Sequence, residues 1–230
     1  MATQVYKTLA KIVGAVLLVL GLAALFGGNF AHGFVSEQLE DQVITMPTEQ
    51  AIDGQVESGR ISAEDGEVLR PFAGETMSTG PHAEAFANHY IRAHMTAAAN
   101  AAGVPEDQAS YSGIGAMVTE KTNALKEELA ALPENADKSE QEIAALANAE
   151  IANPATTFET AAEAAELQAL RMDTFLDGNT LRGMLLNAFG WWLVGTIAIA
   201  AGWALLVLGV LLVVLGFVLK PRTAQAQSEL

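Results

Sequence analysis

The chain has 230 residues, a formal net charge of −15 at neutral pH and no cysteine. This length allows one ordinary domain plus membrane segments, and the lack of cysteine excludes disulfides and thiolate metal sites. A nucleic-acid-binding surface is also excluded as a function, because such surfaces are basic and this chain is strongly acidic.

Two long stretches contain no Asp, Glu, Lys or Arg, namely residues 12–36 and residues 183–219. A charge in mid-bilayer costs roughly 2.5–3.5 kcal/mol on insertion scales, so apolar runs longer than about 18 residues predict membrane spans. We therefore expect one transmembrane helix over residues 12–34 and another over residues 183–219. The second run is too long for one perpendicular crossing, which indicates a stalk at its outer end followed by the span.

Basic side chains flank both runs and predict the orientation of the chain. The flanking residues are Lys7 and Lys11 before the first run and Lys220 and Arg222 after the second. Because Lys and Arg beside a span stay in the cytoplasm, residues 1–11 and 220–230 are expected to be cytoplasmic. The expected location is the plasma membrane, with two crossings.

The first run also resembles a secretory signal, which leaves a second interpretation open. Cleavage after Ala31 would place Asn29 three residues before the cut, where a small residue is required. A retained anchor therefore fits better, and the alternative is a cleaved signal with a single C-terminal span.

Glycine recurs every seven residues in both runs, at Gly14, Gly21 and Gly28 and at Gly195, Gly202, Gly209 and Gly216. A strict seven-residue repeat keeps one helix face toward a partner, and small residues let two backbones approach closely in lipid. We predict an antiparallel transmembrane hairpin that pairs Gly14 with Gly216, Gly21 with Gly209 and Gly28 with Gly202. Alternatively, each glycine face contacts a foreign helix.

Aromatic residues gather where each run is expected to leave the membrane, and amphipathic or bulky rings favour this level. The expected interface residues are Phe26, Phe30, Phe34, Trp191 and Trp192.

Residues 35–182 hold 26 acidic and 8 basic side chains and form the expected extracytoplasmic domain. Start and stop signals predict helices over residues 82–102, 119–132, from the Ser139–Glu142 capping box to residue 153, and over 158–176. The last of these is expected to begin at a Thr156–Glu159 capping box and to end at Gly178. Residues 43–79 are predicted to be an extended linker with a short strand at residues 43–46 and one or two helical turns after Ser62. The predicted fold is thus an all-α membrane protein with a helical domain inserted between two spans.

The one cluster of metal-ligand residue types is His82, Glu84, His89 and His94. Two histidines and a carboxylate suit ferrous iron, but helical ligands sit three or four residues apart, whereas these histidines are five and seven apart. We expect ordinary polar side chains on a helix, with no metal and no other cofactor, and keep the iron site as a minor alternative.

Three segments resemble a known family: residues 34–47 (FVSEQLEDQVITMP), 90–94 (YIRAH) and 178–192 (GNTLRGMLLNAFGWW). They are similar to a family of uncharacterised actinobacterial two-span membrane proteins, some of whose members carry the label "aromatic ring-opening dioxygenase". The resemblance implies the same order of elements along most of the chain, and it transfers no catalytic residue.

The leading functional hypothesis is a non-enzymatic accessory or assembly partner of a larger membrane complex in the cell envelope. Its expected partners are the lipid bilayer and either other membrane proteins or further copies of itself. One alternative is an extracytoplasmic ligand or metal-ion sensor that signals through a partner. The other is a metal-dependent, dioxygenase-like enzyme, which the family label implies.

Overall fold

The structure is a computed structural model that describes residues 2–218, and over this range the chain forms helices and no β-strand. Two helices are long and apolar enough to cross a membrane, Gln4–Glu40 and Glu159–Val218. Lys220 and Arg222, which carry part of the orientation argument, lie outside the described residues. The chain divides into two compact units: unit 1 contains residues 1–44, 76–81 and 187–230, and unit 2 contains residues 45–75 and 82–186.

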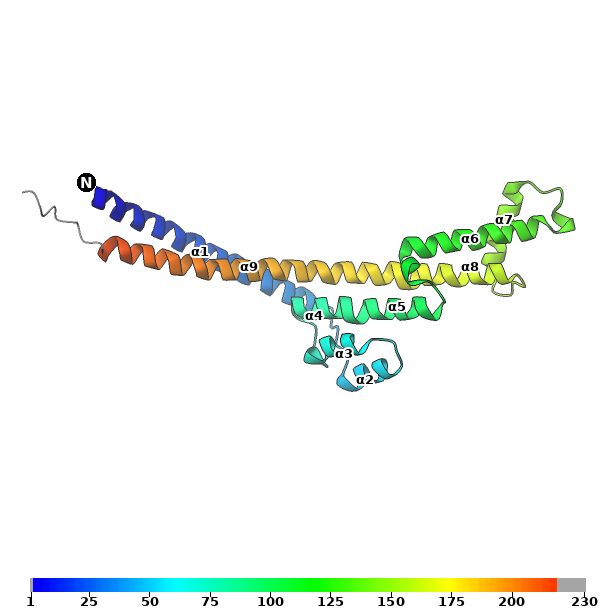
Figure 1. Ribbon diagram of the computed structural model, residues 1–230, viewed down its shortest axis with the longest axis horizontal. Helices are drawn as coiled ribbons and strands as arrows, with labels where there is room; N and C mark the ends of the chain where they lie inside the picture. The colour runs from blue at the N-terminus through cyan, green and yellow to red at the C-terminus, as the bar shows by residue number, and fades with distance from the viewer. Residues whose placement is uncertain (1, 219–230) are drawn as a thin grey trace, which may run out of the picture. The chain divides into compact units, whose positions relative to one another are not determined.

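Unit 1 is built from helix α1 (Ala2–Glu40) and the C-terminal part of helix α9 (Asp177–Val218). The two helices run alongside each other (Figure 1). Their large apolar side chains mostly point outward; the side chain of Phe26, for example, is 77% exposed. In water such a surface would be unfavourable, whereas in lipid it is the expected outer face of a span.

The N-terminal part of α9 continues a helix that begins much earlier. Helix α8 (Glu159–Ala169), a π-helical segment η5 (Leu170–Leu176) and α9 form one uninterrupted helix of 60 residues. The expected helix end at Gly178 is therefore wrong. A Cβ atom at Gly178 would lie 2.6 Å from the sulfur of Met95, so this glycine allows a close helix contact and does not cap a terminus.

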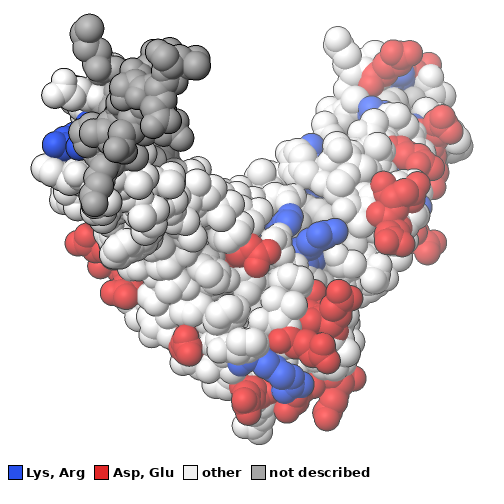
Figure 2. All heavy atoms as spheres, turned by 60° about the vertical axis from the view of Figure 1, so that its left-hand side comes forward, with Lys and Arg blue, Asp and Glu red and all other residues white. Residues whose placement is uncertain are grey.

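Unit 2 contains the remaining helices, whose acidic side chains crowd its surface (Figure 2). They are α2 (Glu49–Glu57), α3 (Ala63–Leu69), η1 (Arg70–Phe72), α4 (Gly80–Ala85), η2 (Phe86–Ile91), α5 (Arg92–Ala101), η3 (Glu106–Gln108), α6 (Tyr111–Ala130), η4 (Pro133–Asn135), α7 (Glu140–Ile151) and α8. The first two residues of α4 belong to unit 1.

Two of the expected helices have the termini that the sequence predicts. Helices α4, η2 and α5 run on from one another and end before Gly103, whose φ of 68° is typical of a residue that stops a helix. Helix α7 begins directly after its N-cap, Ser139, and the side chains of Ser139 and Glu142 form the predicted capping box.

Other expected boundaries are wrong. Thr156 does not cap α8, whose N-cap is Phe158; the Thr156 hydroxyl accepts from the backbone N–H of Phe158 and donates to the Glu150 carboxylate at 2.7 Å. Helix α6 starts at Tyr111 with Ser110 as its cap, eight residues earlier than expected. The predicted linker over residues 43–79 contains α2, which was not expected and is capped by Thr48. By contrast, α3 follows Ser62 as expected and begins with a Ser62–Asp65 capping box. The strand expected at residues 43–46 is reduced to an isolated bridge at Thr45.

Two apolar clusters hold unit 2 together. In Figure 1, α6 and α8 lie side by side, and both clusters involve these two helices. The first cluster joins them to α5 and the π segment η5 through Met95, Ala99, Val104, Ile114, Leu167 and Phe175. The second joins them to α7 through Leu125, Leu129, Ile143, Ala147 and Ala161. Alanine at three of these positions lets the helices pack closely, with little apolar volume between them.

Candidate functional site

The seven glycines of the repeat all lie at the contact between α1 and α9. A Cβ atom on Gly14, Gly21 or Gly28 would lie 2.8, 2.9 or 2.6 Å from the carbonyl oxygen of Gly209, Gly202 or Gly195, respectively. Between residues 4 and 34, and again between residues 187 and 218, these glycines are the only buried positions. The two helices therefore touch backbone to backbone, as small residues permit within a membrane.

The order of the contacts is antiparallel, but the register differs from the predicted one by seven residues. Gly14 lies opposite Gly209 where Gly216 was expected, and Gly216 packs against the backbone of Lys7 and the side chain of Lys11. The predicted register would place Gly195 beyond the last glycine of α1. In the structure Gly195 instead faces Gly28 and His32, and the contacts of His32 explain this register.

His32 joins the two helices of unit 1 by stacking and by hydrogen bonding. Its ring lies on the indole of Trp192, with 3.9 Å between centroids and 5° between planes. Its Nε2 is 3.0 Å from the carbonyl oxygen of Trp192 and 3.0 Å from the hydroxyl oxygen of Thr196. Because the Thr196 hydroxyl itself donates to that carbonyl, the consistent arrangement has Nε2–H as the donor.

The position of His32 relative to the glycine repeat is a sequence signal for this role. His32 follows Gly28 by four residues, so it lies on the same face of α1 as the glycines. A Cβ atom on Gly195 would be 2.7 Å from the imidazole ring. The glycine repeat therefore provides the space that the histidine ring occupies.

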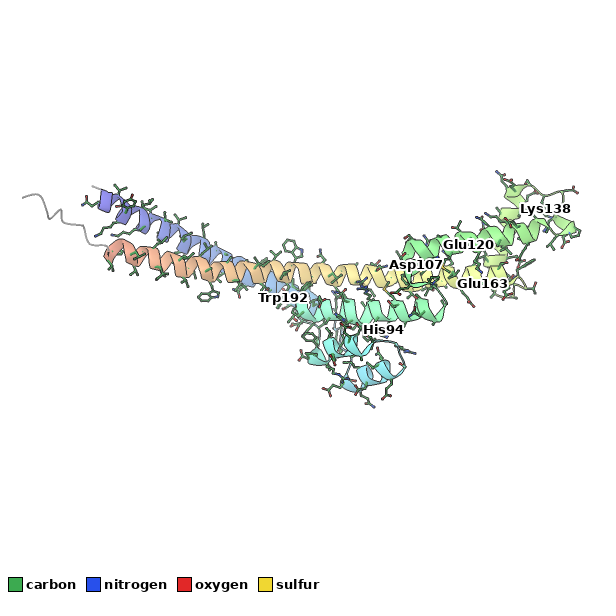
Figure 3. The ribbon with its side chains drawn as sticks, viewed as in Figure 1. His94, Asp107, Glu120, Lys138, Glu163 and Trp192 are labelled. Carbon is green, nitrogen blue, oxygen red and sulfur yellow. The ribbon has the colours of Figure 1, made fainter. Side chains whose placement is uncertain are left out.

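The aromatic residues expected at the membrane interface lie in unit 1, where Phe26, Phe30, Phe34 and Trp191 are exposed. Trp192, labelled in Figure 3, is half-buried against His32. Phe30, Phe34 and Trp191 border an apolar groove of about 410 Å³, whose base is formed by Gly27, Ala31, Val194, Gly195 and Ala198. Residues of both α1 and α9 line this apolar groove.

The four candidate metal ligands in unit 2 are not brought together. His82 pairs with Glu75 at 3.2 Å, and the Glu84 carboxylate accepts from the Asn88 amide. His94, on α5 (Figure 3), bonds through Nδ1 to the carbonyl oxygen of Tyr90 one turn earlier. Within residues 2–218 no three His, Asp or Glu side chains are grouped to hold a metal ion.

His89, the fourth candidate, forms a pair with Asp65 on α3 instead. Nδ1 of His89 is 2.9 Å from the carboxylate, which also accepts from the backbone N–H and hydroxyl of Ser62. Burial alone raises the pKa of Asp65, but the bonds from Ser62 and His89 outweigh it and hold that pKa below its ordinary value of 3.8. Asp65 therefore stays ionised and links α3 to the π turn η2.

The Asp65→Asn variant is expected to lower the free energy of unfolding of unit 2 by about 1–3 kcal/mol at neutral pH, since it weakens charge-assisted hydrogen bonds. A depressed folded-state pKa contributes stability above the unfolded value, and this contribution is lost as pH falls from about 3.8 through the folded pKa. Denaturant titrations at pH 7 and in this acidic window measure the difference, which should shrink in acid. Asp53→Asn is the control, because its pair with Arg70 is exposed and contributes about 0–1 kcal/mol. Equal losses for the two variants at neutral pH would contradict the assigned role of Asp65.

Comparison of the chain with protein-family models, curated proteins and solved structures finds no match.

Proposed function

We propose that the protein is an integral membrane protein of the plasma membrane in which α1 and α9 form an antiparallel transmembrane hairpin. The acidic helices of unit 2 are inserted between these spans and lie outside the cytoplasm, and both termini lie inside. The support for this proposal is that the buried positions of the two apolar helices between residues 4 and 34 and between residues 187 and 218 are limited to the seven glycines. The remaining apolar surface is that of helices whose surroundings are lipid.

The hairpin serves as the membrane module of a non-enzymatic accessory subunit that binds another membrane protein. The small-residue faces of α1 and α9 are used within the chain, so they are not available to a foreign helix. The apolar groove bordered by Phe30, Phe34 and Trp191 is a concave surface of this unit that a partner can contact. An apolar groove at this position suits a transmembrane helix of the partner, whose side chains would replace lipid between the rings.

Photo-cross-linking in the native membrane tests this function. A photoreactive amino acid at Phe34 or Trp191 is expected to form an adduct with a second protein. The control position is Val207, which is comparably exposed and apolar but does not line the groove. An adduct of twice the mass of the chain would identify the partner as a second copy. Lipid adducts alone at all three positions would contradict the proposal.

A further inference from the structure

A polar groove in unit 2 lies between α5 and the segment from Gly59 to Asp65, and its volume is about 790 Å³. On the α5 side, the lining residues His89, Arg92, Thr96 and Asn100 are spaced along one helical face, with alanines between them. On the opposite side lies Arg60. Polar groups on both walls and small side chains between them leave room for a small polar solute.

The two arginines of this groove, Arg60 and Arg92, differ from Arg70 and Arg171 of the same unit. Arg70 pairs with Asp53, and Arg171 stacks on Tyr111 and donates to its carbonyl oxygen. Within residues 2–218, neither Arg60 nor Arg92 forms an ion pair with a carboxylate. Both side chains are exposed, so their guanidinium groups are accessible to a solute that enters the groove.

A third guanidinium group, that of Arg182, adds to the local positive charge. Its Nε donates to the carbonyl oxygen of Ala87 at 3.0 Å and its Nη2 to the side-chain oxygen of Asn88 at 3.1 Å, so its charge is met by neutral acceptors. Burial lowers the pKa of Arg182, and the charge of Arg92 lowers it further, which shows that the two cations are close enough to repel.

The π turn η2 creates this arrangement. In a π turn the backbone N–H of Arg92 donates to Ala87, five residues earlier. The Ala87 carbonyl oxygen thus accepts from the backbone of Arg92 and from the guanidinium group of Arg182. Segments of π-helix occur frequently at functional sites, because they cost stability and reorient side chains.

Three acidic residues also line the groove, and among the described residues none of them forms an ion pair with Arg60 or Arg92. Asp65 already accepts from Ser62 and His89. Glu64 lies in the first turn of α3 and Glu106 in the first turn of η3, where free backbone N–H groups favour a negative charge. Because these carboxylates repel an anion, the groove suits a ligand small enough to contact the arginines while it stays away from the carboxylates.

We propose that this groove binds a small oxyanion, a carboxylate or a phosphate, through the guanidinium groups of Arg60 and Arg92. Guanidinium groups recognise such oxygens by paired hydrogen bonds. Thr96 and Asn100 offer further donors on the same face of α5. The site lies wholly within unit 2, so it does not depend on the membrane hairpin or on a protein partner.

Isothermal titration of the purified full-length protein in detergent tests the site, with succinate and inorganic phosphate as separate probes. Ionic strength is kept constant with chloride. Saturable 1:1 binding of at least one probe is expected, and Arg60→Gln or Arg92→Gln should each weaken it roughly tenfold or more, the usual effect of losing a hydrogen bond between charged groups. Arg92→Lys keeps the charge but loses the paired bonds, so its affinity should be intermediate.

Arg70→Gln is the control, since Arg70 is paired with Asp53 and does not line the groove; it should change the affinity by less than about twofold. Circular dichroism checks that the helical content of each variant is unchanged. Repeating the titration in nanodiscs with and without phosphatidylglycerol separates a lipid phosphate, which would compete with the probe, from a free solute. Absence of saturable binding of both probes, or equal affinity in the wild type and both Gln variants, would overturn the proposal.

Discussion

Replacing Gly28 by isoleucine is expected to force α1 and α9 apart in unit 1. A Cβ atom at this position would lie 2.6 Å from the carbonyl oxygen of Gly195 and 2.6 Å from the side chain of Ile199. Because backbone atoms cannot rotate away, the helices must separate. The expected cost is about 1–3 kcal/mol or more, the usual range for overpacking a close contact.

Gly27→Ile is the matched control, since a Cβ atom at Gly27 meets nothing within 4 Å. The chain has no native cysteine, so spin labels can be attached to cysteines placed at the exposed positions Leu20 and Val207. The distance between the labels should lengthen and broaden with Ile at residue 28 and stay unchanged with Ile at residue 27. Identical distance distributions in the two variants would show that the helices do not meet through their glycines.

A reporter that is active only in the cytoplasm is expected to give full signal at the C-terminus and background signal when inserted after Gly103. Gly103 separates α5 from η3 within unit 2, and its exposed turn suits an insertion. The positive-inside rule, applied to Lys7, Lys11, Lys220 and Arg222, is the physical basis for this difference. A reporter that is active only outside the cytoplasm should give the opposite pattern and serves as the control.

Strong cytoplasmic signal after Gly103 would refute the proposed topology. N-terminal sequencing of the mature protein tests the alternative in which the first apolar run is a cleaved signal. A new N-terminus near residue 32 would remove the three glycines of the α1 repeat, Gly14, Gly21 and Gly28, and the hairpin with them. Recovery of the intact N-terminus would favour the retained anchor.

Local signals in the sequence were sufficient where the physical cause was itself local. Ser139 caps α7 because its hydroxyl accepts from the backbone N–H of Glu142, three residues later, and Gly103 stops α5 by adopting a positive φ. By contrast, Gly178 has the appearance of a helix stop but lies inside a helix, because its role is set by Met95, more than eighty residues away. Thr156 likewise has the appearance of an N-cap in the sequence, but Phe158 holds that position in the structure, and the Thr156 hydroxyl donates to Glu150.

The candidate sites divide in the same way. The repeat of glycines predicts which faces of α1 and α9 are small, and those faces meet in the structure. The groove with Arg60 and Arg92 had no sequence signal, because its walls come from segments some thirty residues apart that only the packing of α3 on η2 brings together. The Asp65–His89 pair had no sequence signal either, because its two residues are 24 apart in the chain and meet only through the same packing.

The seven-residue spacing on both helices has a mechanical consequence: it works like a ruler with identical divisions. Sliding one helix along the other by one division, about 10.5 Å at 1.5 Å per residue, again puts three glycines of α1 opposite three glycines of α9. The glycines alone therefore allow both alignments equally. His32 serves as the index mark, because only one alignment brings its ring onto Trp192 and within reach of Thr196. The contacts of the His32 imidazole therefore set the alignment of the two helices, and with it how far one helix extends past the other.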